Sequence, residues 1–145
     1  MKNLKLALAF VLSLPGLAFA QEGATTYPFD GSFADATFSV ESAIVNRGLV
    51  IDYVSHTGEM LNRTGEDVGS DVKLFEAADI FVFCSAVLSR KMMEADPMNI
   101  AYCPYGIFVA DRGGKVVVGY RNYPEGIMQE VQALLDDIVQ EAVSN

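Results

Sequence analysis

Apolar residues recur at helical spacing through residues 32–47, where they would line one face of an amphipathic helix. Ser32 stands at the N-cap position, and Asp35 follows three residues later at the spacing of a capping box. Gly48 comes after the last apolar position and suits the end of a helix. The pattern therefore predicts a first helix from Ser32 to Arg47.

Short runs of β-branched and aromatic residues predict the strands of a sheet. These runs are residues 27–31, 49–55, 80–84, 105–110 and 115–121. The first is expected at a sheet edge, because Pro28 cannot donate a ladder hydrogen bond. The last two are joined by the glycine-containing turn 111–114 and predict a hairpin.

Two more helices are predicted in the second half of the chain. Ser85 is placed to cap a helix that ends at Asp96-Pro97. Pro124 occupies the favoured first position of a last amphipathic helix, residues 124–145.

The order of these elements predicts an α+β fold: a single mostly antiparallel sheet with helices packed on one face. A doubly wound parallel sheet is disfavoured, because no glycine-rich phosphate loop joins a strand to a helix. We expect one α+β domain over residues 27–123, preceded by a flexible segment at 21–26 and followed by the C-terminal helix at 124–145.

The first twenty residues have the pattern of a secretory signal peptide. A basic start and an apolar run from Leu6 to Leu14 precede Ala18-Phe19-Ala20, which has the spacing of a cleavage site. Cleavage is expected before Gln21. The run is too short to span a bilayer, so we expect no membrane span in the mature chain and a periplasmic or secreted product.

The chain is acidic, with a formal net charge of -9 over 145 residues. Binding to nucleic acid requires a basic surface, so this charge argues against a nucleic-acid partner. It also argues against adsorption to anionic lipid. The length fits one domain of ordinary size.

Two cysteines, Cys84 and Cys103, are predicted at the end of one strand and just before the next. If these strands are antiparallel neighbours, opposed α-carbons lie about 4.5–5.5 Å apart, within disulfide range. With one strand between them the separation is about 10 Å, and no bond forms. Export favours a structural disulfide. A reactive thiol site and an inert pair of buried thiols remain the alternatives, because sequence does not give the pairing.

A metal site is a further hypothesis for the same region. Its candidate ligands are His56, Cys84, Cys103 and Met92. Thiolate, thioether and imidazole together suit Cu(I) or another soft metal. The spacing is not a zinc pattern. The alternative interpretation, a core methionine and a turn histidine, is more common for such residues.

The stretch 56–69 contains three glycines, and we expect no more than a helical turn there, through residues 59–63. Gly58 and Gly65 would permit close approach of the backbone to a ligand, with Arg63 as a charged neighbour. This candidate ligand loop stands against the interpretation of a turn-rich connection.

Three motifs carry a resemblance to a known family: Arg47-Gly48-Leu49 after the first helix, Glu94-Ala95-Asp96-Pro97 in the segment after Cys84, and Cys103-Pro104 before the strand Ile107-Phe108-Val109. From about Tyr27 to Tyr123 the chain resembles the domain of unknown function 302 family; the helix after Pro124 lies outside the match. The resemblance implies an α+β fold with an antiparallel sheet, often seen as a homodimer, and no established activity. Members often carry Asn-Pro after the first cysteine, where this chain has Ser85-Ala86.

We therefore expect an exported, non-enzymatic binding module. It would hold a small ligand, a metal or a protein partner on the concave side of the sheet or at the Cys84/Cys103 end. A thiol-redox or thiol-carrier protein that uses Cys84 and Cys103 is the first alternative. An interaction subunit that works as a dimer is the second.

Overall fold

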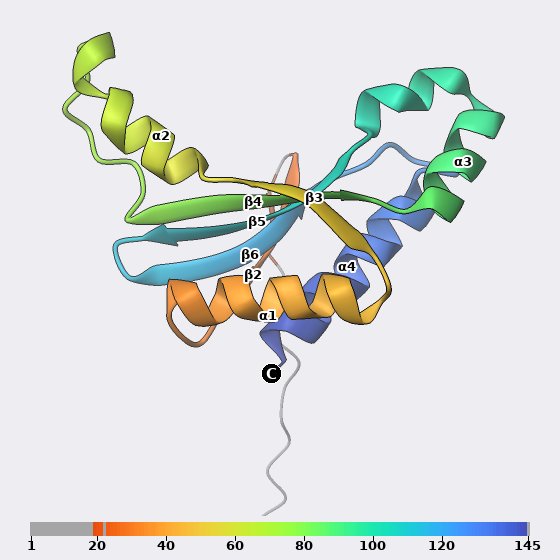
Figure 1. Ribbon diagram of the computed structural model, residues 1–145, viewed down its shortest axis with the longest axis horizontal. Helices are drawn as coiled ribbons and strands as arrows, with labels where there is room; N and C mark the ends of the chain where they lie inside the picture. Colours follow the sequence, from red (N-terminus) through yellow and green to blue (C-terminus); the bar gives the residue numbers. More distant parts are fainter. Residues whose placement is uncertain (1–18, 22, 145) are drawn as a thin grey trace, which may run out of the picture.

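The computed structural model describes residues 19–21 and 23–144. Over these residues six strands form one sheet in the order β1-β2-β6-β5-β4-β3 (Figure 1). Each strand runs antiparallel to its neighbours. The strands are β1 Phe19–Gln21, β2 Ala24–Pro28, β3 Val50–Ser55, β4 Ala77–Cys84, β5 Tyr105–Arg112 and β6 Lys115–Arg121.

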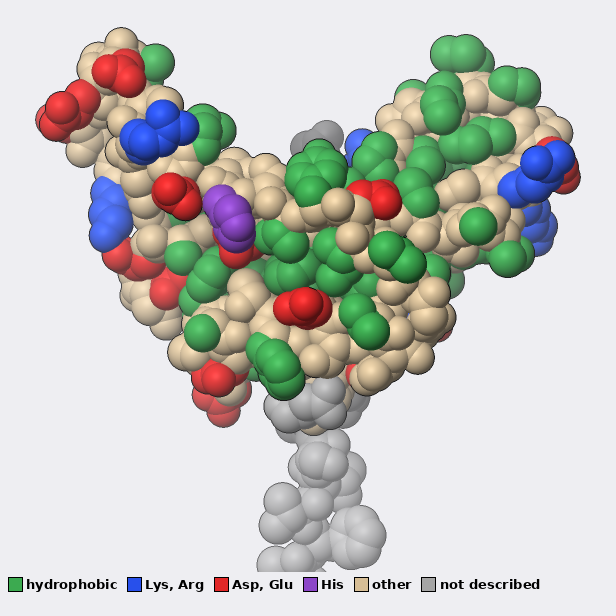
Figure 2. All heavy atoms as spheres, in the orientation of Figure 1, with side chains coloured by type: hydrophobic (Ala, Val, Ile, Leu, Met, Phe, Trp, Pro, Cys, Tyr) green, Lys and Arg blue, Asp and Glu red, His purple; other side chains and the backbone are tan. Residues whose placement is uncertain are grey.

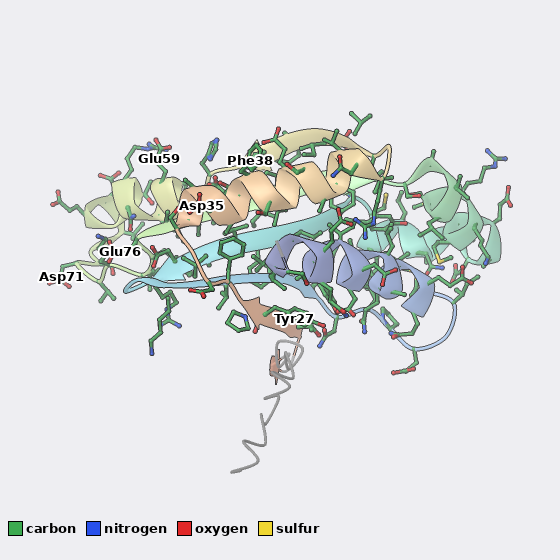
Figure 3. The ribbon with its side chains drawn as sticks, turned by 90° about the horizontal axis from the view of Figure 1, so that it is seen from below. Tyr27, Asp35, Phe38, Glu59, Asp71 and Glu76 are labelled. Carbon is green, nitrogen blue, oxygen red and sulfur yellow. The ribbon has the colours of Figure 1, made fainter. Side chains whose placement is uncertain are left out.

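The two longest helices cover one face of this sheet, and the middle of the other face is open (Figure 1). The helices are α1 Phe33–Asn46, α2 Thr57–Thr64, η1 Glu66–Val68, α3 Ala86–Ala95, η2 Pro97–Tyr102 and α4 Gln129–Val143. α1 and α4 lie side by side across one face (Figures 1 and 3). α2 and α3 stand at opposite ends of the sheet and rise on its other side (Figure 1). The predicted α+β fold, with an antiparallel sheet and helices packed on one face, is confirmed. In the part of the chain that the structure describes, no helix is long and apolar enough to cross a bilayer.

A single hydrophobic core fills the space between the sheet and the two covering helices. Alternate strand residues point into it, because successive side chains of a strand face opposite sides. Each fully buried aliphatic or aromatic side chain stabilises the fold by about 1.5–3 kcal/mol. The core residues include Val40 and Ile44 of α1, Phe81, Phe83, Ile107, Val109 and Val118 of the sheet, and Leu135 and Ile138 of α4.

Polar contacts fix α4 to the sheet and to α1. The hydroxyls of Tyr27 and Tyr120 both donate to Oδ1 of Asp136, at 2.6 and 2.5 Å. Burial, followed by the Asp136 carboxylate, raises the pKa of Tyr27 to about 12 and raises that of Tyr120 further. Both hydroxyls therefore stay protonated and remain donors at neutral pH. The Arg47 guanidinium pairs with Glu141 at the other end of α4.

The predicted helix starts are confirmed at α1 and α3. Ser32 accepts from the Asp35 N–H, and the Asp35 carboxylate accepts from the Ser32 N–H, so the capping box is complete. The Ser85 hydroxyl accepts from the Leu88 N–H at the start of α3. Such caps satisfy N–H groups that have no partner within the helix.

The first strand predicted from the sequence, residues 27–31, lies three residues too far along the chain. Residues 24–26, expected in a flexible segment, belong to β2, and the strand ends at Pro28 instead of continuing to residue 31. Thr25 and Thr26 are polar, but they pair with Tyr120 and Gly119 of β6. Ladder pairing with a central hairpin strand therefore outweighs the low local hydrophobicity.

The helix α2 is longer than the expected turn, because its glycines do not interrupt it. Gly58 lies within the helix against β4, where a Cβ would stand 2.4 Å from the Ala78 nitrogen. Gly65 comes after the last residue of α2, and Gly69 adopts a φ of 73° after η1. The glycines allow close packing and termination of the helical segment.

The last helix begins later than Pro124 predicts. Gly126 has a φ of 90°, which no helical residue adopts, and α4 starts at Gln129. The side chains of Gln129 and Gln132 bond the carbonyl and the N–H of Tyr123, which holds the preceding segment against the helix.

Candidate functional site

The two cysteines lie together where β4 ends. Cys84 Sγ is 3.1 Å from Cys103 Sγ, and both residues are half-buried. β4 and β5 are direct neighbours, and Phe83 opposite Tyr105 is the last pair of their ladder. The prediction that these cysteines meet at adjacent antiparallel strands therefore fits the geometry. A disulfide bond length of about 2.05 Å is within reach of a small movement.

The surroundings of the thiol pair come from α3 and β5. The Ser89 hydroxyl is 3.8 Å from Cys103 Sγ and 3.1 Å from the Tyr105 hydroxyl. The Cys103–Pro104 peptide bond is cis. Burial raises the pKa of the Cys84 thiol to about 11, and the neighbouring Cys103 sulfur adds to the rise. Cys84 therefore holds its proton at neutral pH and is a poor attacking thiol.

The four residues proposed as soft-metal ligands do not come together. Ser55 pairs with Ile80 and Val50 pairs with Cys84, so His56 lies about five residues, or roughly 16 Å, along the strand from Cys84. Met92 is a core residue that is 1% exposed. Among the described residues no group of three or more histidine, cysteine, aspartate and glutamate side chains is placed to hold a metal ion. The combined His56–Met92–thiolate site is therefore wrong in its geometry.

His56 instead lines a polar cavity, which we call the His56 groove. It has a volume of about 590 Å³ and lies between α2 and the start of β4. Its lining includes Phe33, His56, Glu59, Asn62, Arg63 and Asp79. His56 Nδ1 is 2.8 Å from Asp79 Oδ1, and this hydrogen bond, with the Asp79 charge, raises the pKa of His56. The His56 side chain is 61% exposed, so its polar atoms stay in contact with water.

The candidate ligand loop is only partly brought together. Arg63 lines the His56 groove, but the two glycines serve packing: Gly58 fits against the Ala78 backbone, and a Cβ on Gly65 would stand 2.9 Å from the Ser70 carbonyl oxygen. Neither glycine lines this groove. Gly58 and Gly65 therefore have a structural explanation that needs no ligand.

A trough on the open face of the sheet is the third feature, and sequence analysis did not identify its residues. We define the trough by Tyr53, Ile80, Val82, Gly106, Phe108 and Arg121, and it has a volume of about 360 Å³. Figure 2 shows the hollow outline between the two raised arms of the molecule, with hydrophobic side chains at its base. Ala24, Pro104 and Tyr105 complete the lining.

The sheet register explains the hollow. Val82 pairs with Tyr53 on one side and with Gly106 on the other. Ile107 pairs with Tyr120, which places Gly106 opposite Arg121. Gly106 has no side chain, so a gap opens between Val82 and Arg121. A Cβ at that position would meet Ile80 Cγ2 at 3.4 Å and the Phe81 carbonyl oxygen at 3.9 Å, both at ordinary van der Waals distances.

A second glycine sets the position of the aromatic wall. Phe108 pairs with Gly119 of β6, and a Cβ on Gly119 would stand 2.7 Å from the Phe108 ring. The ring therefore lies over the bare backbone of β6. The cysteines are chain neighbours of the trough residues but do not line the trough, since Cys84 follows two residues after Val82 and Cys103 precedes Pro104.

One sequence signal would have found this trough. The strands β4 and β5 are apolar on both faces: Phe81 and Ile107 enter the core, while Ile80, Val82 and Phe108 point away from it. A sheet covered by helices on one face normally alternates apolar and polar residues. The continuous apolar run of residues 80–83 thus indicates that this strand has apolar side chains on both faces of the sheet.

Fold and site together define a small α+β protein with an open sheet face and a paired thiol at its rim. The chain belongs to the family described as Domain of unknown function DUF302, which matches residues 25–145. The match includes the last helix, which the resemblance seen in the sequence left out.

A solved structure has the same fold. The chain is similar to the crystal structure of an uncharacterized conserved protein DUF302 from Bacillus stearothermophilus, with a TM-score of 0.59 and 13% identity. The alignment covers 86% of this chain and 94% of that chain. No curated protein matches the chain. The comparisons therefore establish the family and the fold, and they support no specific activity.

Proposed function

We propose that this member of the DUF302 family is an exported binding protein that holds a small, largely apolar ligand in the trough. The observation that carries the proposal is an apolar hollow of about 360 Å³ on a sheet face that the described helices leave uncovered. Small-molecule sites are mostly apolar clefts of roughly 300–1,000 Å³, so the trough has the size of a site for a small ligand.

The side chains of the trough support a binding role better than a purely structural one. Tyr53 is 58% exposed on β3, beside Val82 and Ile80 of β4. Val82, in contrast, is only 7% exposed. Leaving apolar surface such as that of Tyr53 in water forfeits about 25 cal/mol per Å², which a bound apolar ligand would recover. Contiguous exposed apolar surface on a soluble protein commonly marks an interaction site.

The polar His56 groove is the weaker candidate. Its charged side chains are already solvated or paired, as the hydrogen bond between His56 and Asp79 illustrates. A ligand entering this groove would have to replace water at each of these groups. The trough offers more unsatisfied apolar surface and fewer polar groups to desolvate.

We assign Cys84 and Cys103 a structural role beside the trough. In an oxidising compartment the pair would form a disulfide that ties the junction of β4 and α3 to Pro104, a wall residue of the trough. The raised pKa of Cys84 makes this thiol a weak nucleophile for thiol-redox exchange, which needs a thiolate at neutral pH.

Export is part of the proposal. The predicted signal peptide, residues 1–20, falls mainly on residues 1–18, which lie outside the described part of the chain. Phe19 and Ala20 of β1 would leave with the signal peptide, and β2 would then be the edge strand. The intact mass of protein recovered from outside the cytoplasm tests both points. The mass should correspond to a chain that starts at Gln21 and lacks two hydrogen atoms.

The binding function is tested with a neutral apolar fluorescent probe, N-phenyl-1-naphthylamine. We expect saturable binding to the wild type and a loss of binding in Gly106→Val, whose side chain would fill the gap between Val82 and Arg121. Val87→Ser is the control, because Val87 is an exposed residue of α3 and does not line the trough. Equal binding by wild type and Gly106→Val, with both proteins folded, would refute the proposed site.

A further inference from the structure

We propose that the ligand of the trough carries a carboxylate, which Arg121 binds at the rim while the apolar body lies over Gly106. The inference rests on the proposed binding function and names the chemical class of its ligand: a small amphipathic monocarboxylic acid. Three properties of Arg121 lead to it: its position in the trough, the contacts that hold its guanidinium in place, and its charge.

The position of Arg121 puts a cation at the end of an apolar surface. Arg121 is the last residue of β6, it faces Gly106 across the ladder, and it lines the trough together with Phe108. The remaining walls are apolar or aromatic. A ligand that lies along the trough therefore meets apolar groups over its body and one positive charge at its end.

The guanidinium is held in place by main-chain acceptors and aromatic rings. Arg121 Nη2 donates to the carbonyl oxygens of Tyr102 and Pro104, at 3.1 and 3.2 Å, and Nε donates to the Tyr123 hydroxyl at 3.5 Å. Its Cζ lies 6.0 Å from the Tyr102 ring centroid and 5.4 Å from that of Tyr123, within cation–π range. These contacts fix the side chain before any ligand arrives, which reduces the entropy lost on binding.

The charge of Arg121 lacks an acidic partner in the described part of the chain. The ion pairs there join Arg47, Lys73, Arg90, Lys91 and His56 to carboxylates, and none involves Arg121. The chain as a whole has 19 acidic and 10 basic residues. An arginine that keeps its charge for an incoming anion is complementary to a carboxylate, which Arg121 would bind through the two N–H groups of Nη1.

A second copy of the chain is the competing occupant of the open face. Charge argues against it, because two chains of net charge -9 repel each other and the trough offers one arginine against that repulsion. The size of the trough also fits a small molecule. The experiment therefore includes a measurement of the oligomeric state.

The test compares octanoate with 1-octanol by titration calorimetry on the mature, oxidised protein. The two probes share an apolar chain and differ in charge. We expect the wild type to bind octanoate at least about tenfold more tightly than octanol, the effect of one charged hydrogen-bonded pair. Arg121→Gln should lose this preference while its affinity for octanol stays the same. Arg112→Gln, an exposed arginine outside the trough, is the matched control and should keep the preference.

Equal affinity of the wild type for octanoate and octanol would overturn the role of Arg121 and leave the apolar binding site intact. Loss of both affinities in a folded Arg121→Gln would also overturn it, because the residue would then only shape the trough. Arg121→Lys, which keeps the charge, separates these cases by retaining part of the preference. A stable dimer by light scattering that binds neither probe would overturn both proposals.

Discussion

The sulfur atoms of Cys84 and Cys103 lie 3.1 Å apart, just beyond the last residue pair of β4 and β5. Nineteen positions separate the two residues in the chain, and the segment between them contains α3 and η2. A bond between the sulfurs would close this segment into a loop. It would also fix the end of the trough, because Pro104 is a wall residue.

We predict that reduction of this disulfide destabilises the protein by about 3 kcal/mol, the loop-entropy value for a closed segment of this size. The measurement is urea unfolding of the mature protein with and without a reductant. The double variant Cys84→Ser/Cys103→Ser is the control and should not respond to the reductant. A wild type that unfolds at the same urea concentration in both conditions would show that no bond forms.

The two tyrosines that donate to Asp136 should make that residue important for stability. In Asp136→Ala both hydroxyls lose their acceptor in a partly buried site, and we expect a loss of about 2 kcal/mol in the free energy of unfolding. Asp137→Ala changes an exposed carboxylate on the same helix and should cost about 0.5 kcal/mol or less. Chemical unfolding measures both; equal losses would contradict the assigned role.

The packing role of Gly58 gives a test against the ligand-loop hypothesis. A Cβ would stand 2.4 Å from the Ala78 nitrogen, so Gly58→Ala forces α2 away from β4. We expect a loss of about 1–2 kcal/mol, because overpacking outweighs the gain of about 1 kcal/mol in helix propensity. Met60→Ala is the control, since Met60 is exposed on the same helix. A Gly58→Ala variant of unchanged or higher stability would refute close packing here.

The hydrogen bond between His56 and Asp79 should appear in the titration of the imidazole. The pKa of His56 is raised, chiefly by that hydrogen bond and by the Asp79 charge. A raised folded-state pKa means that the contact stabilises the fold at pH values below the unfolded pKa, about 6.5, and that the stabilisation is lost as the pH rises through the folded pKa. NMR titration of the ring protons measures this pKa.

Asp79→Asn should lower the His56 pKa toward its ordinary value, because the charge of the partner is removed. Glu76→Gln is the matched control, since Glu76 lines the same groove but does not bond His56. The same pKa in wild type and Asp79→Asn would show that the contact is absent in solution.

Local signals in the sequence were enough for much of the fold. The capping box of Ser32 and Asp35, the cap at Ser85 and the hairpin turn through Gly113 and Gly114 all lie within a few residues of the feature that they predict. The sequence predicted that the two cysteines lie close together on the condition that their strands are antiparallel neighbours, and β4 and β5 meet that condition.

Tertiary contacts decided the features that the sequence did not predict. The polar Thr25 joins a strand because β6 offers it a partner, and α2 continues through Gly58 because β4 packs against it. The trough depends on cross-strand neighbours, such as Gly106 opposite Arg121, that are distant along the chain. The proposed metal site failed for the same reason, since residue types alone did not show that His56 and Cys84 stand at opposite ends of β4.

The most direct test of the central claim is an amide NMR titration of the mature protein with octanoate. A ligand held in the trough should shift the signals of Val82, Gly106, Phe108 and Arg121 and leave Glu59 in the His56 groove unchanged. Shifts confined to the His56 groove, or no saturable shifts at the trough residues, would contradict the account.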